Sequence, residues 1–409
     1  MQTVASVSAN VLSIILAGGK GERLRPITER RAKPAVPFGG AYRIIDFTLS
    51  NCVNSNFRRL IVLTQYESLT LERHVFRAWN ILSPEMGEFI DILPPQQRLP
   101  NRWYEGTADA IFQNLYVLEQ EKPRWVLILG GDHIYKMNYR ALLDRHRAEG
   151  AAATIGCIDV PREEARVLGV MQVDAESRIV GFQEKPSDPT PLPGQPDRAL
   201  ASMGIYLFDT DVLVRAVIQD AKTPGSSHDF GGDIVPRLIG DHKVLAYNLN
   251  DPEQPGVAYW RDVGSLDAYW QSNMDLLARH PEIDLYDEDW PIRSGLGSRP
   301  PAKICVSTEG TMGVVEQSIV APGTVISGGH VRASVVGPRV EVHNGSALDQ
   351  CVVMGGVHIG KYVRLRRAII EESTRVPDGA TVGYDVEADR RRFKVTEQGV
   401  AVIPRSAPF

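Results

Sequence analysis

The sequence predicts an α/β domain with a mostly parallel sheet, followed by a left-handed parallel β-helix. From Leu12 to about Asp275, short aliphatic runs alternate with helical patterns, which is typical of a parallel sheet covered by helices. Near residue 308 the helical patterning ends, and aliphatic residues begin to recur every six positions. Such a period indicates a β-helix, because each coil stacks its aliphatic positions on those of the next.

The aliphatic series in the C-terminal part carries the β-helix prediction. Its members stand six apart, with short slips between sets: Ile319, Val325, Val331, Val336, Val342, Leu348, Val357, Val363, Ile369, Val376 and Val382. Chance spacing in another β-rich domain is the alternative. The length of the series favours a β-helix of about three to four coils, which needs neighbours to cover its ends and faces.

Composition sets the domain boundaries. We place the α/β domain at residues 1–280 and the β-helix at 308–409, joined by a linker over 281–307. Prolines oppose regular structure in this linker: Pro281, Pro291, Pro300 and Pro301. Trp290 lies among them, which indicates that the linker packs against a domain.

The composition excludes several classes of function. A length of 409 residues allows two or three domains, and 43% hydrophobic with 23% charged residues is ordinary for a globular protein. The net charge of −5 provides no overall basic field for nucleic acid. No signal peptide is evident, and no stretch approaches the about 18 consecutive apolar residues of a membrane span. The cysteines lack zinc-binding spacing and are expected to be buried thiols of a cytoplasmic protein: Cys52, Cys157, Cys305 and Cys351.

A glycine-rich turn follows the first predicted strand, Leu12 to Leu16. Its glycines let the backbone approach a ligand closely: Gly18, Gly19 and Gly21. Basic residues are concentrated in and after the turn: Lys20, Arg23, Arg25, Arg30, Arg31, Lys33 and Arg43. A basic turn at the carboxyl end of a parallel strand is a typical phosphate site, although a solvated glycine turn is the alternative. The spacing is neither that of a dinucleotide fold nor that of a P-loop.

Two acidic residues stand where strands end. Asp132 follows the aliphatic run Trp125 to Leu129 and two glycines, and Asp262 lies between a strand-like and a helix-like segment. Either could instead cap a helix or close a turn. Carboxylates together with phosphates are the ligands that Mg²⁺ prefers. With the basic turn, they indicate a metal-bridged polyphosphate site.

Two lysines are candidates for binding phosphate. Lys33 precedes Pro34 and lies close to Pro37, so it is presented on a stiff loop. Lys185 lies between Glu184 and a proline, after a strand-like run. The alternative for each is a solvated surface lysine.

Further motifs follow in order across residues 12–267: GGKGERL, RAKPAVPFGGAYRIIDFTLSNC, WYEGTADA, GGDHIYKMNY, FQEKP, ASMGIY, SSHDFGGDIVP and YWRDVGS. With the six-residue repeat, they make nearly the whole chain resemble the glucose-1-phosphate adenylyltransferases, also called ADP-glucose pyrophosphorylases. The resemblance implies a Rossmann-like nucleotidyltransferase domain that uses Mg²⁺. It implies adenylyl transfer from ATP to glucose 1-phosphate for glycogen biosynthesis, with release of pyrophosphate.

The resemblance also implies residue roles. Asp132 and Asp262 are expected to hold the metal, with Asp132, Arg23 and Lys33 catalytic. Glu184 and Lys185 are expected to bind glucose 1-phosphate. Other expected substrate contacts are Gly18, Gly19, Gly21, Tyr104, Gly106, Thr107, Gly169 and Ser202, with Gln96 or Gln97 reading the base. Because the attacking phosphate is already ionised, no general base is needed. His133 is therefore expected to be structural.

Members of this family are typically homotetramers regulated by small anions that bind between the two domains. On the catalytic side the candidate residues are Arg30, Arg31 and Arg43. On the β-helix side they are Arg364, Arg366, Arg367 and the run from Arg390 to Arg392. For the run Arg390 to Arg392, a solvated helix is the alternative. The sequence departs from some relatives at Arg30, Pro37, Glu105 and Asn138, which leaves the activator open.

Three other functions are compatible with this architecture. A related transferase could use UTP, dTTP or GTP, and a regulatory subunit could be catalytically silent. Retention of the key acids and cations argues against silence: Arg23, Lys33, Asp132, Lys185 and Asp262. A β-helix acyltransferase is less well supported, since no catalytic histidine is indicated.

Overall fold

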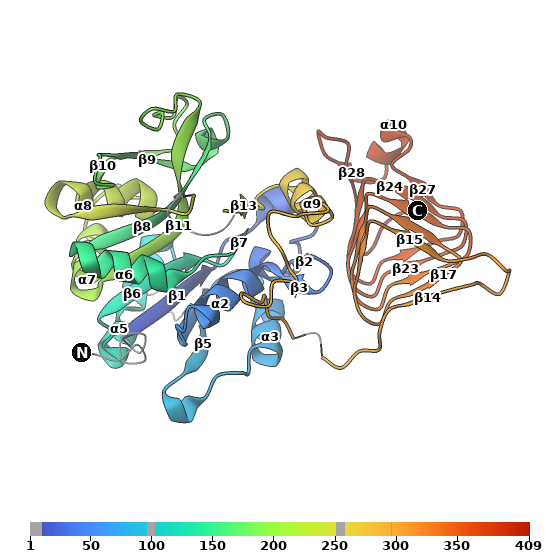
Figure 1. The fold of residues 1–409 in the computed structure, drawn as a ribbon, viewed down its shortest axis with the longest axis horizontal. Coiled ribbons are helices and arrows are strands. Elements are labelled where there is room, and N and C mark those ends of the chain that lie inside the picture. Colours follow the sequence, from blue (N-terminus) through green and yellow to red (C-terminus); the bar gives the residue numbers. More distant parts are fainter. Residues whose placement is uncertain (1–9, 96–102, 251–257, 296) are drawn as a thin grey trace.

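The computed structural model describes residues 10–95, 103–250, 258–295 and 297–409. It contains an α/β domain and a β-helix, which lie side by side with the linker running between them (Figure 1). This arrangement confirms the predicted fold class.

The α/β domain is built on a nine-stranded sheet in the order β10-β9-β11-β6-β1-β4-β5, with β8 pairing β11 and β12. Its strands are β1 (Val11–Ala17), β4 (Arg59–Thr64), β5 (Phe89–Leu93), β6 (Trp125–Gly130), β8 (Ala153–Pro161), β9 (Gly169–Val173), β10 (Ile179–Glu184), β11 (Arg198–Asp209) and β12 (Val244–Asn248). Strands β10 and β11 run opposite to the others, so the sheet is mostly parallel, as predicted.

Helices cover both faces of this sheet, because its central strands are apolar on both sides. In β1, Val11 and Ile15 face one core, whereas Leu12 and Ile14 face the other. The first core includes residues of α2 (Ile44–Asn54), α3 (Leu69–Ala78) and α6 (Tyr139–Glu149). The second includes residues of α4 (Thr107–Gln113), α5 (Leu115–Glu121), α7 (Thr210–Ala221) and α8 (Val235–Asp241).

The apolar residues between positions 108 and 118 belong to two successive helices. Helices α4 and α5 meet at Asn114, whose side chain donates a hydrogen bond to the carbonyl oxygen of Ala110 at 2.8 Å. Ala108, Ile111 and Leu118 are buried in the second core.

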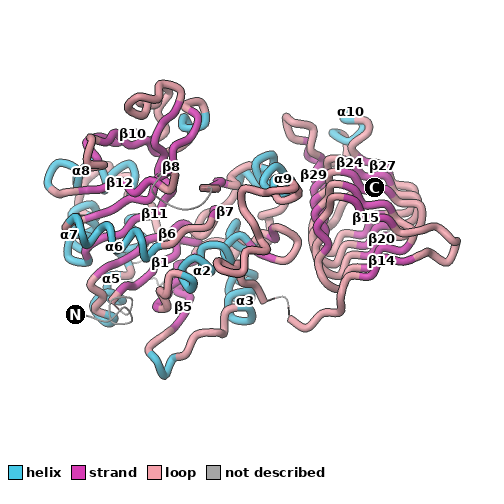
Figure 2. The backbone as a smooth tube through the Cα atoms, in the orientation of Figure 1, coloured by secondary structure: helices cyan, strands magenta, loops and turns pink. Residues whose placement is uncertain are grey.

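The β-helix has three faces, whose strands run parallel except for one antiparallel pair at the end of the third (Figure 2). The first contains β14 (Lys303–Cys305), β17 (Val325–Ser327), β20 (Glu341–Val342), β23 (His358–Ile359) and β26 (Arg375–Val376). The second contains β15 (Val314–Glu316), β18 (His330–Arg332), β21 (Ala347–Asp349), β24 (Arg364–Arg366) and β27 (Thr381–Val382). The third contains β16 (Ile319–Val320), β19 (Val335–Val336), β22 (Val352–Val353), β25 (Ala368–Ile370), β29 (Ala401–Ile403) and β28 (Lys394–Val395).

The expected number of coils was too small. Two of the faces have five strands each, so five coils stack. Equivalent residues on successive coils stand 16 or 17 positions apart, which is short of three full six-residue steps and explains the slips in the series. Strand β14 lies within the predicted linker and was missed because its residues are largely exposed.

The third face of the β-helix packs on the α/β domain. Val352, Met354 and Ile369 share one apolar core with Phe38 and Phe47. Helix α9 (Leu266–Asp275) contributes Trp270, whose Nε1 donates a hydrogen bond to the Gln350 carbonyl oxygen at 2.9 Å. The linker also packs, as predicted from Trp290, whose Nε1 donates to Asn51 Oδ1 at 2.8 Å.

Short elements complete the fold: β2 (Pro37–Phe38), β3 (Tyr42–Arg43), β7 (His133–Tyr135), β13 (Trp260–Asp262) and α10 (Val386–Arg390). All the cysteines are free, and Cys52, Cys157 and Cys351 are buried as expected. Cys305 in β14 is half-buried, which corrects the expectation for that thiol. Within the described residues, no helix is long and apolar enough to cross a membrane.

Candidate active site

A cavity of about 730 Å³ opens where β1 and β6 end, at the carboxyl edge of the sheet. This is where ligands bind in open α/β sheets. Of the predicted site residues, the following line it: Gly18, Gly19, Gly21, Arg23, Lys33, Tyr104, Gly106, Thr107 and Asp132. Gln96 and Gln97 lie outside the described residues.

The glycine turn forms one wall of the cavity. Gly21 has a φ of 61°, a left-handed conformation that favours glycine, and its carbonyl oxygen accepts a hydrogen bond from Thr28 Oγ1 at 2.8 Å. Arg23 follows in a short 3₁₀ turn, Glu22–Leu24. Its Nη2 lies 3.9 Å from Asp262 Oδ2, and 73% of its side chain is exposed. The guanidinium is therefore free to meet an anion in the cavity.

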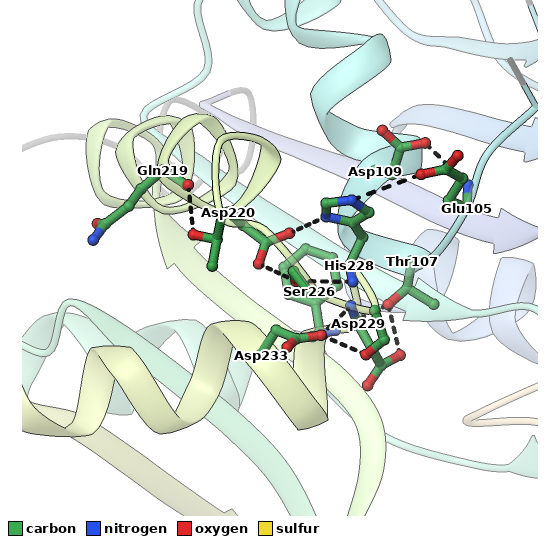
Figure 3. A network of polar contacts seen from close by, with 12 residues as sticks. Glu105, Thr107, Asp109, Gln219, Asp220, Ser226, His228, Asp229 and Asp233 are labelled. Carbon is green, nitrogen blue, oxygen red and sulfur yellow. Dashed lines mark hydrogen bonds and ion pairs between the residues drawn. The ribbon is translucent and has the colours of Figure 1, made fainter.

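The opposite wall requires a glycine at position 106. A side chain there would place its first carbon 2.2 Å from the His228 carbonyl oxygen, so the two segments could not approach. This approach brings Thr107 next to Asp229, whose Oδ2 accepts a hydrogen bond from Thr107 Oγ1 at 3.0 Å (Figure 3). The other oxygen of Asp229 accepts from the backbone N–H groups of Gly231 and Gly232.

The two predicted metal ligands meet although they are far apart in the sequence. Asp132 stands two residues after the end of β6, beyond Gly131. Strand β13 pairs antiparallel with β7, so that Asp262 stands opposite His133. Lys33 lies between the carboxylates, with its Nζ 3.0 Å from Asp132 Oδ2 and 2.7 Å from Asp262 Oδ1. The structure thus brings the acids and the lysine into one cluster.

Charge interactions within this cluster shift two pKa values. Burial acts to lower the pKa of Lys33, but attraction to Asp132 and then Asp262 outweighs it and raises that pKa above its usual value. Burial acts to raise the pKa of Asp132, but Lys33 and then His133 hold it well below its usual range. Lys33 and Asp132 therefore both carry their charges at neutral pH.

His133 lies closer to this cluster than its expected structural role suggested. Its Nε2 is 3.6 Å from Asp132 Oδ1, and one ligand atom from each of His133, Asp132 and Asp262 fits within 4.8 Å of the others. Its Nδ1 is shielded from solvent and has no hydrogen-bond partner among the described residues.

The residues expected to bind glucose 1-phosphate lie beside the cavity, on β9, β10 and β11. Glu184 pairs in register with Gly169, and Lys185 follows it with a φ of 44°. Lys185 Nζ lies 2.7 Å from Glu184 Oε1. Ser202 on β11 hydrogen bonds to Tyr206, a cavity residue.

The sequence patterns assigned no role to several residues that line the cavity, among them Tyr206, Asp229 and Phe230. Burial raises the pKa of Tyr206, and the negative charges of Asp229 and Glu184 raise it further, although the Ser202 hydrogen bond opposes them. Ser202, Asp229 and Glu184 therefore all influence the Tyr206 hydroxyl. The motifs ASMGIY and SSHDFGGDIVP contain Tyr206 and Asp229, and those motifs were the available signal.

A second cavity, of about 300 Å³, lies between the domains. Arg31 lines it and is bound to the β-helix, with Nη1 2.6 Å from Glu372 Oε2 and Nη2 3.1 Å from Glu371 Oε1. Arg43 Nη2 lies 3.5 Å from Glu372 Oε1. The arginines in its lining are Arg30, Arg31, Arg339 and Arg405, of which the last two were not anticipated.

The arginines predicted on the β-helix side do not line this cavity. Arg364 and Arg366 lie on the second face, whereas the third face packs on the α/β domain. Arg364 stacks on the ring of Tyr384 at 4.3 Å, and Arg366 Nε lies 3.8 Å from Asp349 Oδ2. Arg390 ends α10, with its Nη1 2.7 Å from Glu387 Oε1. The expected position of these three arginines between the domains is therefore wrong for this single chain.

The fold and the cavity define a nucleotidyl transferase, and comparison with known families agrees. The family model described as "Nucleotidyl transferase" matches residues 12–279, and "GlmU-like, C-terminal hexapeptide" matches residues 300–403.

Individual relatives show which nucleotidyl transferases the chain is similar to. A glucose-1-phosphate adenylyltransferase of Rhodopirellula baltica is 49% identical to this chain, and the matched region spans 96% of this chain and 90% of the relative. One from Methylococcus capsulatus is 48% identical, covering 98% and 94%. Glucose-1-phosphate adenylyltransferase 2 of Vibrio cholerae is 45% identical, covering 98% and 99%. The chain belongs to the glucose-1-phosphate adenylyltransferase family of nucleotidyl transferases.

Proposed function

We propose that this chain transfers the adenylyl group of ATP to glucose 1-phosphate, giving ADP-glucose and pyrophosphate for glycogen biosynthesis in the cytoplasm. The cluster of Asp132, Asp262 and Lys33 beside the glycine turn carries the proposal. It joins a set of carboxylates to a basic, glycine-lined wall, which is what a bound nucleoside triphosphate requires.

The acid pair fits a magnesium ion. Lys33 Nζ contacts both carboxylates, so the position between them already accommodates positive charge. Carboxylate oxygens are the protein ligands that Mg²⁺ prefers. Asp132 and Asp262 would hold the ion, which would supply positive charge to the phosphate oxygens.

The chain's own residues then position two anions that repel each other. Arg23 and the glycine turn bind the triphosphate, while Lys185 and Glu184 hold glucose 1-phosphate. An oxygen of the sugar phosphate attacks the α-phosphorus, and the bond from that phosphorus to the oxygen of the leaving pyrophosphate breaks in line. The attacking oxygen carries no proton at neutral pH, so the cluster acts by positioning and charge rather than by proton transfer.

Nucleotide preference separates this proposal from its alternatives. The purified chain is supplied with glucose 1-phosphate, Mg²⁺ and ATP, UTP, dTTP or GTP in turn, and pyrophosphate release is measured. Release with ATP at least about tenfold faster than with the others is expected. Preference for another nucleotide would make the chain a different sugar-phosphate transferase, and no release with any would make it a silent subunit.

Lys185 is expected to contribute to the binding of glucose 1-phosphate but not to the binding of ATP. Its substitution by alanine removes one charged hydrogen bond to phosphate, so the KM for glucose 1-phosphate rises by roughly 10- to 100-fold. The KM for ATP stays within about twofold. Lys222→Ala, which changes an exposed lysine at the end of α7, is the matched control. An unchanged KM for glucose 1-phosphate in the Lys185 variant would remove that role.

The proposal includes regulation by small anions at the interdomain cavity and assembly into a homotetramer. Four arginines and three glutamates line the cavity, the glutamates being Glu29, Glu371 and Glu372. Glu371 and Glu372 both pair with Arg31. The lining keeps an excess of one positive charge, which favours a bound anion. Because the β-helix and the α/β domain both contribute to the lining, an anion bound there would contact both domains.

Arg30 offers a direct test of this cavity. Sugar phosphates, pyruvate, AMP and phosphate are screened for effects on wild-type activity. In Arg30→Ala, the concentration needed for half the effect is expected to rise by roughly 10- to 100-fold, because a charged hydrogen bond is lost. Arg390→Ala is the control, since that arginine lies outside the cavity lining. A larger effect of the Arg390 substitution would place the regulatory site elsewhere.

A further inference from the structure

The first face of the β-helix carries a cluster of metal-ligating side chains: Glu341, His343 and His358. Glu341 lies on β20, and His343 is the first residue after that strand. His358 lies on β23, in the next coil. The α/β domain packs on the third face, so this cluster is separate from the active site and from the interdomain cavity.

The ligand atoms of this cluster are already spaced for one ion. Glu341 Oε2 lies 3.0 Å from His358 Nδ1 and 3.7 Å from His343 Nε2, and one ligand atom from each residue fits within 4.8 Å of the others. The imidazole rings have centroids 4.6 Å apart. Ligands about 2.0–2.1 Å from a tetrahedral zinc ion stand roughly 3.3 Å from one another. The observed separations therefore need only small side-chain adjustments.

One of these atoms has no hydrogen-bond partner among the described residues. His343 Nε2 is shielded from solvent and has no hydrogen-bond partner in the part of the chain that the structure describes. A shielded nitrogen without a partner is costly, and most such atoms are hydrogen bonded or bind an ion. Glu341 Oε2 lies 3.7 Å from this nitrogen, so the nitrogen is on the side of the ring that faces the glutamate.

The backbone that holds the cluster is rigid. Glu341 pairs in register with His358, and the three residues donate backbone hydrogen bonds to the next coil, from Glu341 to Val357, His343 to Ile359 and His358 to Thr374. These bonds are 2.9–3.1 Å long. A site on such a scaffold is preorganised, which lowers the free energy needed to assemble it.

We propose that Glu341, His343 and His358 bind one divalent transition-metal ion, with Zn²⁺ as the reference ion. Imidazole nitrogens favour zinc and its neighbours, whereas Mg²⁺ prefers oxygen ligands alone. The ion takes His343 Nε2, His358 Nδ1 and one oxygen of Glu341, and water completes the shell. It links two successive coils of the β-helix and stabilises them, while the active-site acids retain Mg²⁺.

Zinc binding to the full-length chain tests this site. Protein freed of metal by chelation is dialysed against Zn²⁺, and bound metal is counted in the wild type and in His343→Ala and Glu341→Gln. His330→Ala is the matched control, because that histidine lies on the second face, 3.5 Å from a single carboxylate of Glu316. Zinc ions held by Cys305 or by the active-site acids are common to all four proteins, so they do not affect the differences in zinc content between them.

The wild type and the control are expected to bind one zinc ion more than His343→Ala. Glu341→Gln keeps the side-chain shape and is expected to bind that ion at least about 10- to 100-fold more weakly. Zinc should also raise the unfolding temperature of the wild type, but not that of the variants. Pyrophosphate release under Mg²⁺ stays unchanged in all four. Equal zinc content and affinity in the wild type and Glu341→Gln would overturn the proposal, whatever the folding of the alanine variant.

Discussion

Replacement of Asp132 by asparagine is expected to lower turnover by about 10³-fold, with the fold retained. Asparagine has the same size as aspartate but carries no charge, so the acid cluster loses one of the two carboxylates expected to hold the metal. A metal ion bound to the reacting phosphates stabilises the transition state by several kcal/mol. A loss of about 4 kcal/mol corresponds to a rate about 10³-fold lower. Steady-state pyrophosphate release measures the loss.

Asp211→Asn is the control for this substitution. Asp211 is an exposed aspartate of α7 that pairs with Arg215, so its turnover should match the wild type. Circular dichroism and thermal unfolding of both variants establish that the fold is kept. Near-normal turnover of Asp132→Asn would remove that carboxylate from the mechanism.

Substitution of Lys33 by methionine is expected to change both the rate and its pH dependence. The buried ammonium bridges Asp132 and Asp262, and methionine fills similar space without the charge. Turnover at neutral pH should fall by about 10²-fold or more. The reason is that a positive group beside the negative charge that develops on the phosphates in the transition state accelerates the reaction by at least that factor.

The direction of the pH shift follows from the cluster. In the wild type, Lys33 is the largest of the influences that lower the pKa of Asp132, while burial acts to raise it. Without the lysine, burial dominates and the pKa of Asp132 rises. The carboxyl group then gains its proton at a higher pH, so activity on the acid side is lost at a higher pH than in the wild type. A drop in turnover with the acid limb unmoved would show that Lys33 does not control the charge of Asp132.

Local patterns in the sequence predicted much of the fold. In the run from Leu12 to Leu16 every residue but the half-buried Leu16 is buried. Nine of the eleven aliphatic positions counted in the six-residue series are buried in the β-helix, Ile319 and Val325 being half-buried. Asp132 and the glycine turn could be placed at the sheet edge because both lie within a few residues of a strand end.

Contacts between distant segments could not be read from such patterns. The pairing of β13 with β7, which brings Asp262 opposite His133, joins two short strands that have no periodicity of their own. The bridging position of Lys33 depends on that pairing. The same limit applies between the domains, where Arg31 meets Glu371 and Glu372. Arg364 and Arg366 were misplaced because a basic composition does not reveal which face of a β-helix a strand occupies.

The central claim is that the chain moves the α-phosphoryl group of ATP, with its nucleoside, onto a sugar phosphate. The most direct measurement supplies the purified chain and Mg²⁺ with glucose 1-phosphate and ATP labelled at either the α- or the γ-phosphorus. Label from the α-position is expected in ADP-glucose, and label from the γ-position in pyrophosphate. Label from the γ-position in the sugar product, or no labelled sugar nucleotide at all, would contradict the account.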